Sequence, residues 1–277
     1  MSSRRANVAG GTASAGEADV AVDDDARWFT SHYEEAASSI VDFLGGVHLS
    51  PTGKDVADIG CGDGIIDLGL AHKAQPRRLV GYDIDLDVQD VRRELTRAAA
   101  KAGVSSELPG CLDFARSEPL SIPAADASFD VVITCSAFGH IADPAAVAGE
   151  MRRIIRPSGT LFLQLWPFYY SAHGSHLWEW FPGEQFVQLR RSVEDIEAVL
   201  RASPRGPTPQ WSERMLNEFR SLNRITLDEL QRALLAGGFA VRLVELDTPT
   251  IDLPAEVAEH RLVDLAVSGI TLLAQPC

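Results

Sequence analysis

The clearest candidate for chemistry is the glycine-rich run Asp58-Ile59-Gly60-Cys61-Gly62-Asp63-Gly64. A strand-like segment, Lys54–Ile59, enters this run, and a helix-like segment, Ile65–Lys73, leaves it. Glycines allow a tight turn and let a ligand lie against bare backbone. In doubly wound sheets, ligands bind in the crevice beyond the carboxyl ends of the strands. The sequence therefore predicts a ligand-binding loop after the first strand.

A carboxylate follows the next predicted strand. Arg78–Tyr82 reads as a second strand, and Asp83 stands at its end. An ionised carboxylate accepts two hydrogen bonds in a fork, each worth roughly 1.5–3 kcal/mol. Asp83 is therefore a candidate hydrogen-bond acceptor for a ligand. The glycine spacing argues against a dinucleotide, because the fingerprint G-x-G-x-x-G would need a third glycine where Ile65 stands.

These motifs, in this order, resemble those of the class I S-adenosylmethionine-dependent methyltransferases, in particular the type 11-like group. Asp58–Gly64 looks like the first motif of the family and Gly81–Ile84 like the second. Ile155–Gly159 is similar to the turn before the fifth strand. The resemblance spans Lys54 to Trp166 and implies S-adenosyl-L-methionine as the cofactor.

The resemblance also implies a set of cofactor-binding residues. They are Asp58, Gly60, Cys61, Gly62, Asp83, Ile84, Ser117, Glu118, Cys135, Ser136 and Tyr33. The pair Ser117-Glu118 falls where the family usually has Gly-Asp beside the adenine. Tyr33 lies on a predicted helix that resembles the family's lid. Cys61 reads as a small side chain in a tight turn rather than as a nucleophile.

Three histidines are candidates for a general base, which contributes about 10²–10⁴-fold to proton transfer. His173 and His176 follow the fifth strand, and His140 follows the fourth. Together with Glu179, the spacing of His173 and His176 could also hold a metal ion. Gly174 disfavours the rigid helix that such a site needs, so we predict no metal site.

The alternation of strand-like and helix-like segments predicts an α/β fold with a mostly parallel sheet covered on both faces. The resemblance extends this to a Rossmann-like, doubly wound sheet of seven strands with an antiparallel last strand. We expect Asp85 to cap a helix over Leu86–Lys101. We expect Pro157-Ser158-Gly159 to turn the chain into the strand Thr160–Trp166.

Three regions are expected along the chain. Residues 1–25 are rich in Ala, Gly, Ser and Asp and read as a disordered tail, and residues 26–277 form the methyltransferase domain. A segment of about 167–223 is too long for a simple loop and is expected to be a small helical cap. Its aromatic cluster would either stack on a flat substrate or fill the core beneath the cap.

Composition excludes several classes of partner. The net charge is −14 over 277 residues, and no basic run is present, so nucleic acid and anionic membrane surfaces are disfavoured. No run of about 18 apolar residues could cross a bilayer. Four cysteines without metal-ligand spacing and an N-terminus without an apolar leader point to a reducing, cytoplasmic location.

The favoured function is O-methylation of a small molecule, such as a natural product, a sugar or an aromatic metabolite. N- and C-methylation remain open, as does a binding protein that keeps the cofactor pocket without catalysis. A nicotinamide oxidoreductase is disfavoured by the missing third glycine. The oligomeric state is undetermined, with a homodimer as one option.

Overall fold

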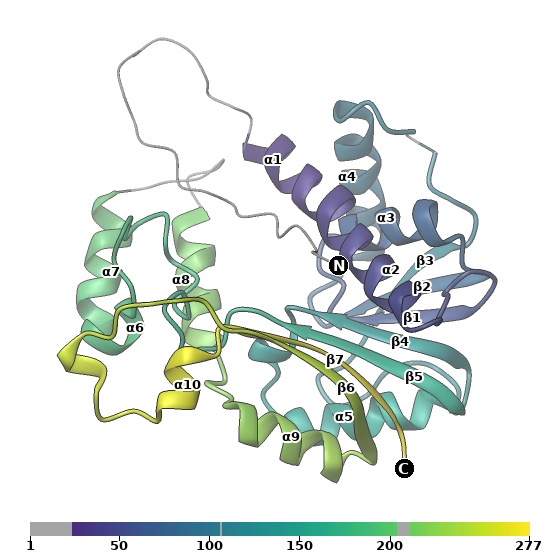
Figure 1. Cartoon of the computed structure of the whole chain (residues 1–277). Helices are drawn as coiled ribbons and strands as arrows, with labels where there is room; N and C mark the ends of the chain where they lie inside the picture. The colour runs from purple at the N-terminus through teal and green to yellow at the C-terminus, as the bar shows by residue number, and fades with distance from the viewer. Residues whose placement is uncertain (1–23, 106, 204–210) are drawn as a thin grey trace, which may run out of the picture.

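A computed structural model describes residues 24–105, 107–203 and 211–277 and contains one seven-stranded sheet. The strands are β1 (Asp55–Ile59), β2 (Arg78–Asp83), β3 (Leu112–Arg116), β4 (Phe129–Cys135), β5 (Ile155–Leu165), β6 (Phe239–Asp247) and β7 (Gly269–Pro276). Their order is β3-β2-β1-β4-β5-β7-β6. The first five strands run parallel, and β7 is antiparallel to both of its neighbours. The predicted doubly wound sheet is confirmed (Figure 1).

Helices cover both faces of the sheet (Figure 1). One face is covered by α1 (Asp24–Thr30), the π-helical η1 (Ser31–Ala36), α2 (Ala37–Gly46), α3 (Ile65–Ala74) and α4 (Val88–Lys101). The other face is covered by α5 (Pro144–Ile154) and α9 (Leu227–Ala236). All five residues of β1 are buried, as expected for a central strand with helices on both sides.

Local sequence explains where three of these helices begin. Asp143 caps α5 by accepting from the Ala146 N–H at 3.0 Å, and Pro144 follows at the first helical position. Thr226 and Glu229 form the capping box of α9. The predicted cap of α4 was wrong. The helix begins at Val88, and its N-cap is Asp87 rather than Asp85. The Asp85 N–H is instead held by Asp83 Oδ1 at 3.0 Å, which keeps Asp85 in the turn after β2.

The prediction of a turn at Pro157-Ser158-Gly159 before the fifth strand was wrong. β5 begins directly after α5, and its pairing with β4 changes register between Phe129 and Val131. Ile155 pairs with Phe129, and Thr160 pairs with Val131, so the residues between them form an irregularity inside the strand. Gly159 is required there, because a Cβ would lie 2.8 Å from the Asp130 carbonyl oxygen.

The segment between β5 and α9 forms a small helical layer beyond the sheet. It contains α6 (Val187–Arg190), α7 (Val193–Ala202) and α8 (Trp211–Ser221), which we call the cap. A separate apolar core lies within it, formed by Tyr169, Leu177, Trp180, Phe181, Val187, Ile196, Leu200, Leu216, Phe219 and Leu222. Residues 204–210 of the predicted cap lie outside the described residues.

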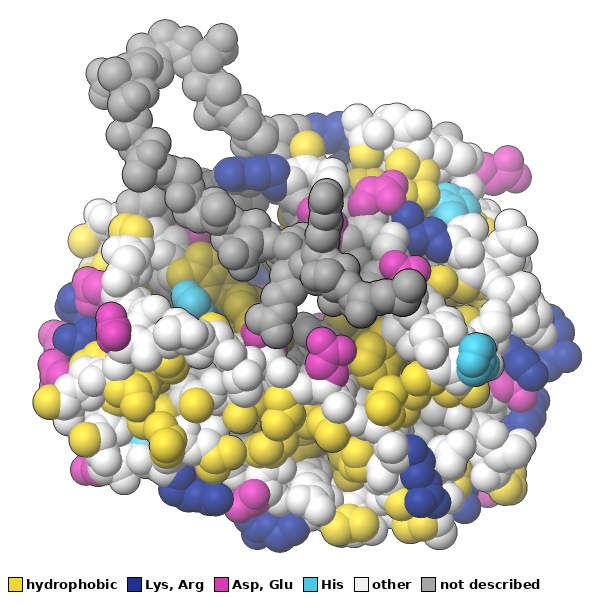
Figure 2. Space-filling view, in the orientation of Figure 1, with side chains coloured by type: hydrophobic (Ala, Val, Ile, Leu, Met, Phe, Trp, Pro, Cys, Tyr) yellow, Lys and Arg dark blue, Asp and Glu magenta, His cyan; other side chains and the backbone are white. Residues whose placement is uncertain are grey.

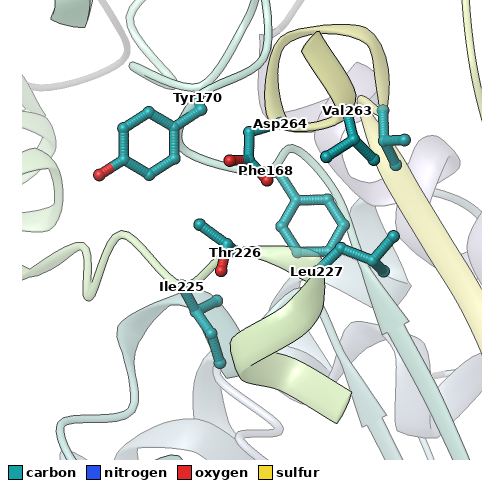
Figure 3. Close-up of a pocket in the computed structure, with 8 residues that line it drawn as sticks. Phe168, Tyr170, Ile225, Thr226, Leu227, Val263 and Asp264 are labelled. Carbon is teal, nitrogen blue, oxygen red and sulfur yellow. The ribbon is translucent and has the colours of Figure 1, made fainter. Parts of the chain in front are cut away.

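The cap is completed by a second segment that the sequence did not reveal. Between β6 and β7 lie η3 (Ala255–Val257) and α10 (Leu262–Ala266), and Figure 1 shows α10 beside the cap helices. Val257 and Leu265 of this segment pack against Ala172 and Phe186. Figure 3 shows the neighbouring small pocket, with Tyr170 and Asp264 among the residues that line it.

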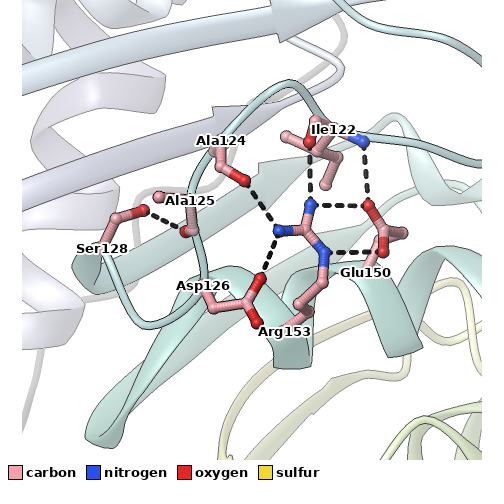
Figure 4. A network of polar contacts seen from close by, with 7 residues as sticks. All are labelled: Ile122, Ala124, Ala125, Asp126, Ser128, Glu150 and Arg153. Atoms are coloured by element: carbon pink, nitrogen blue, oxygen red, sulfur yellow. Dashed lines mark hydrogen bonds and ion pairs between the residues drawn. The ribbon is translucent and has the colours of Figure 1, made fainter.

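Arg153 of α5 anchors the long loop between β3 and β4 (Figure 4). Its guanidinium donates to the carbonyl oxygens of Ile122 and Ala124, at 2.8 and 2.7 Å. It also binds the carboxylates of Asp126 and Glu150, each at 2.8 Å. Hydrogen bonding to Arg153 lowers the pKa of Glu150, which in turn accepts from the Ile122 N–H. One side chain therefore fixes the loop that follows Ser117.

Two further expectations concern the N-terminal tail and membrane-spanning helices. Residues 1–23 of the expected tail fall outside the described residues, and α1 begins at Asp24. Within the part of the chain that the structure describes, none of the helices combines the length and apolar character needed to cross a bilayer.

Replacing Arg153 with alanine should lower the free energy of unfolding by about 2–3 kcal/mol, because several charge-assisted hydrogen bonds are lost together. Urea denaturation measures this. Arg97→Ala is the matched control, since its ion pair with Glu94 is exposed and should contribute less than about 0.5 kcal/mol. Equal effects of the two substitutions would contradict the anchoring role.

Candidate functional site

The candidate site lies where β1, β2, β3 and β4 end. Asp58 of β1 is level with Gly81 of β2 and with Ile133 of β4. Beyond the strands, the N–H groups of Gly60 and Cys61 both donate to the Tyr82 carbonyl oxygen, at 2.8 and 3.2 Å. This pair of bonds ties the glycine loop to the end of β2. The loop and Asp83 therefore lie at the same edge of the sheet.

Two glycines of the loop are required by close packing. Gly60 has φ 82°, and a Cβ there would lie 2.2 Å from Ala137 Cβ in the segment after β4. Gly64 has φ 75°, and a Cβ would lie 2.6 Å from the Phe114 ring. Gly62 differs, because no atom lies within 4 Å of its Cβ position. Its backbone is thus open to a ligand.

Asp83 lies directly beside that open backbone. Its Oδ2 accepts from the Gly62 N–H at 3.1 Å, and its Oδ1 accepts from the Asp85 N–H. Each oxygen keeps further acceptor capacity for a ligand. Ile84 is exposed next to it, and the Ser117 N–H donates to the Asp83 carbonyl oxygen at 2.9 Å. The structure therefore brings together the predicted residues at the ends of β2 and β3, with Ser117 buried and Glu118 exposed.

The end of β4 supplies the opposite side. The Cys135 thiol and the Ser136 hydroxyl donate to Gln164 Oε1 of β5, at 3.2 and 3.0 Å. Sequence reasoning missed Gln164, which lies in an apolar strand and orders this turn. Burial raises the pKa of Cys135 to about 12 and also raises the pKa of Cys61. Both thiols are therefore protonated at neutral pH and are poor nucleophiles.

A second buried carboxyl lies behind the glycine loop. Asp58 is 2% exposed and Asp67 of α3 is 0% exposed. Burial raises the pKa of Asp58 to about 7, although hydrogen bonding to Asp67 lowers it in part. Burial also raises the pKa of Asp67, and the charge of Asp58 raises it further. Sequence reasoning missed Asp67, whose signal is an acid on the buried side of an otherwise apolar helix.

The three predicted histidines share one aromatic cluster under the cap. The rings of His140 and His176 are 5.7 Å apart, and Trp178 lies 6.3 Å from His176 and 6.4 Å from His173. His140 Nδ1 is 3.0 Å from Ser221 Oγ of α8. His140 ends the short helix η2 (Phe138–His140), one turn after the Ala137 that packs on Gly60.

The two histidines of the close pair are held in the neutral form. Burial lowers the pKa of His140, and the Glu218 carboxylate raises it in part. Burial lowers the pKa of His176 to about 4, and the neighbouring His140 lowers it further. Across residues 24–105, 107–203 and 211–277, no three His, Cys, Asp or Glu side chains are grouped to hold a metal ion.

The N-terminal helices meet the glycine loop through Trp28, which sequence reasoning did not single out. Trp28 donates from Nε1 to Asp63 Oδ2 at 2.7 Å. The Tyr33 hydroxyl lies 2.9 Å from His72 Nδ1 near the end of α3. The Trp28 ring also meets Trp211 of the cap, with ring centroids 6.3 Å apart. Trp28 therefore joins α1, the glycine loop and the cap.

Comparison with known proteins agrees with this geometry. Residues 57–163 match the family profile described as a methyltransferase domain. Residues 57–163 thus form a methyltransferase domain. This domain contains the glycine loop, Asp83, the loop anchored by Arg153, and the strand end that holds Cys135 and Ser136.

Curated relatives of the methyltransferase domain share about a third of its residues. A probable methyltransferase of Aspergillus luteorubrus is 32% identical over 38% of this chain and 38% of its own length. A ubiquinone biosynthesis O-methyltransferase of Neisseria meningitidis is 30% identical over 44% of this chain and 48% of its own. A 27-O-demethylrifamycin SV methyltransferase of Amycolatopsis mediterranei is 32% identical over 47% and 45%. The chain thus spans half or less of the length of these relatives.

Solved structures share the fold over most of the chain. An S-adenosylmethionine-dependent methyltransferase from Mesorhizobium loti matches 88% of this chain and 99% of its own, with a TM-score of 0.52 and 18% identity. A [4+2]-cyclase matches 88% of this chain and 82% of its own, with a TM-score of 0.53 and 16% identity. The methyltransferase fold by itself therefore does not fix the reaction.

S-adenosylmethionine is the cofactor that this family indicates, and the site fits it. Gly62 presents open backbone, Asp83 keeps free acceptor capacity, and Asp58 Oδ1 is buried without a hydrogen-bond partner. These groups suit the amino-acid part and the ribose hydroxyls of the cofactor. A sulfonium and an ammonium group also suit an edge at which Asp58, Asp63 and Asp83 gather.

Replacing Asp83 with alanine should weaken binding of S-adenosylmethionine at least about tenfold, because two hydrogen bonds to a charged acceptor are lost. Isothermal calorimetry measures the dissociation constant. Asp113→Ala on the neighbouring strand is the control, since its side chain is largely exposed. Unchanged affinity in Asp83→Ala would place the ribose elsewhere.

Proposed function

We propose that this chain is an S-adenosylmethionine-dependent methyltransferase that methylates an oxygen atom of a small acceptor. The observation that carries the choice of oxygen is the state of His176. Its Nε2 is buried and has no hydrogen-bond partner among the described residues, and burial keeps the imidazole neutral by lowering its pKa to about 4. A neutral imidazole with a free acceptor nitrogen is suited to take a hydroxyl proton.

His140 supports the same role from the other side of the pair. Its Nδ1 pairs with Ser221 Oγ, and its ring meets the His176 ring nearly at right angles. The Ser221 hydroxyl itself donates to the Glu218 carbonyl oxygen at 2.8 Å, so it is left as an acceptor toward His140. The His140 ring is thereby fixed by the cap helix. We assign His176 as the base and His140 as the group that orients the acceptor beside it.

The surroundings favour an apolar or aromatic acceptor. Trp166, Trp178 and His173 present flat faces next to the histidine pair, and Trp178 is 42% exposed. Aromatic faces stack on rings and bind sugars at their apolar side. Two relatives are named for oxygen methylation in ubiquinone biosynthesis and on a demethylrifamycin. The acceptor of this chain is thus proposed to be a small molecule.

Charge supports the exclusion of nucleic acid. On the face in Figure 2, Lys and Arg side chains lie scattered, and apolar side chains form a broad band across the middle. With a net charge of −14, the protein would repel a polyanion.

The residues contribute mainly orientation and proton transfer. When bound, S-adenosylmethionine supplies a methyl group on a positively charged sulfur and leaves as the neutral thioether. The cap aromatics hold the acceptor oxygen in line with that methyl, and orientation of this kind lowers barriers by roughly 7–11 kcal/mol. His176 Nε2 takes the hydroxyl proton as the oxygen–carbon bond forms. Asp83 and the Gly62 backbone keep the cofactor fixed meanwhile.

His176→Ala should lower kcat by about 10²–10⁴-fold while leaving cofactor affinity unchanged, because the base is lost and the loop is not. Steady-state kinetics with a panel of labelled acceptors measures the first quantity, and calorimetry measures the second. His173→Ala is the control and should lower kcat less. Equal losses would remove His176 as the base. Cofactor binding without turnover of any acceptor would favour a binding protein, and product methylated on nitrogen or carbon would overturn the choice of oxygen.

The pH profile gives a separate test. A base works only when it is neutral, and His176, with a pKa of about 4, is charged only when the pH falls through that value. The contribution of this base to kcat should therefore be constant from pH 6 to 8. A kcat that falls tenfold per pH unit below pH 7, at saturating cofactor, would point to a base with an unperturbed pKa.

A further inference from the structure

The Asp58–Asp67 pair lies between the glycine loop and the sheet. Asp58 is near the end of β1, and Asp67 is in the first turn of α3. Space for Asp67 exists because residue 81 of β2 is a glycine. A Cβ at Gly81 would lie 2.6 Å from Asp67 Oδ2 and 2.8 Å from Cys61 Sγ. The two carboxyls are within hydrogen-bonding reach of each other.

This pair has no counter-charge among the described residues. Asp58 Oδ1 and both oxygens of Asp67 are buried without a hydrogen-bond donor. The titratable groups that face the pair are all acids or thiols. They are Asp63 and Cys61 of the loop, Asp83 at the end of β2 and Cys135 at the end of β4. Two buried carboxylates in contact cannot both be ionised, so at least one proton is shared between them.

We propose that Asp67 is a positioning residue that stays protonated and donates its hydroxyl to Asp58, and that binding of the ammonium-bearing end of S-adenosylmethionine displaces a second proton from Asp58. This inference rests on the proposed cofactor site. The proton that leaves Asp58 passes to solvent, and the carboxylate that remains pairs with the ligand's ammonium group. Asp67 keeps its own proton throughout.

The physical reason is that a buried charge on Asp58 needs a hydrogen-bond donor and a positive charge beside it. An ionised Asp58 needs a donor, because an uncompensated buried charge costs several kcal/mol. The protonated carboxyl of Asp67 is a donor within reach, and a second carboxylate there would repel the charge instead. The ammonium group of the ligand then supplies the electrostatic attraction that the Asp58 carboxylate lacks in the free protein. Ligand binding and proton release are therefore linked.

The sign of the linkage follows from the raised pKa of Asp58, which is about 7 in the free protein. Below that pH, Asp58 must lose a proton before the cation can pair with it. Affinity for S-adenosylmethionine should therefore fall about tenfold for each pH unit below 7. Above pH 7, Asp58 is already ionised, and the linkage disappears.

Calorimetry on the full chain tests this between pH 5.5 and 7.5. S-adenosylmethionine should bind about fivefold more weakly at pH 6 than at pH 7, because half of Asp58 is already ionised at pH 7. Repeating the titration in buffers with different ionisation heats should show release of roughly one proton per site at pH 6. 5′-Methylthioadenosine is the control probe, because it lacks the ammonium group and should bind equally at both pH values. A flat affinity for S-adenosylmethionine would overturn the inference.

Substitutions of Asp67 distinguish a role in hydrogen bonding to Asp58 from a role in packing alone. Asp67→Asn keeps a donor toward Asp58 and should retain the affinity at pH 7 within about threefold, with the same pH midpoint. Asp67→Leu has no donor and should raise the midpoint by at least about one pH unit, with a loss of about tenfold in affinity at pH 7. Binding of 5′-methylthioadenosine and a melting temperature no lower than that of the wild type show that the loop is intact. A wild-type pH profile in Asp67→Leu would overturn the role.

Asp58→Asn provides the second line of evidence if the leucine variant does not fold. It should abolish both the pH dependence and the proton release while still binding 5′-methylthioadenosine. Proton release that persists in Asp58→Asn would assign it to another group and overturn the inference. If the wild-type chain binds no S-adenosylmethionine at any pH, the proposed function fails. If it binds without proton release, only the role of this pair fails.

Discussion

The site depends on two hydrogen bonds that the Tyr82 carbonyl oxygen accepts. The donors are the N–H groups of Gly60 and Cys61, and these bonds fix the glycine loop to the end of β2. That position places the Gly62 N–H on Asp83 and brings Gly60 so near Ala137 that no side chain fits. Asp83, Ser117, Cys135 and Ser136 then lie at or directly beyond the ends of the neighbouring strands β2, β3 and β4.

The buried pair Asp58 and Asp67 makes the stability of the fold depend on pH. A carboxyl with a raised pKa favours folding in its protonated form, so its contribution to the free energy of unfolding declines as the pH rises from about 4 towards 7. A fold selected for stability alone would place an apolar residue at Asp67. Its retention at a fully buried position is consistent with a ligand that supplies positive charge.

The cap determines the environment of the histidine cluster. Its core is separate from the two cores of the sheet, and it reaches the strand ends through Trp166, the histidine cluster and Trp211. Because burial rather than ionic partners keeps His140 and His176 neutral, the chemistry of this half depends on the exclusion of water. The cap thus sets both the shape and the proton affinity of the acceptor side.

The sequence by itself determined the sheet, the glycine loop, Asp83 and the capping residues Asp143 and Thr226, because strand and helix periods, glycine spacing and caps are local signals. Only the tertiary structure decided which side chains meet across the fold. It paired His140 with His176, brought Trp28 onto Asp63 of the loop, and added the segment between β6 and β7 to the cap. Asp67 belongs to this second group, since burial against Gly81 on another strand, rather than its place in a helix, gives the carboxyl its properties.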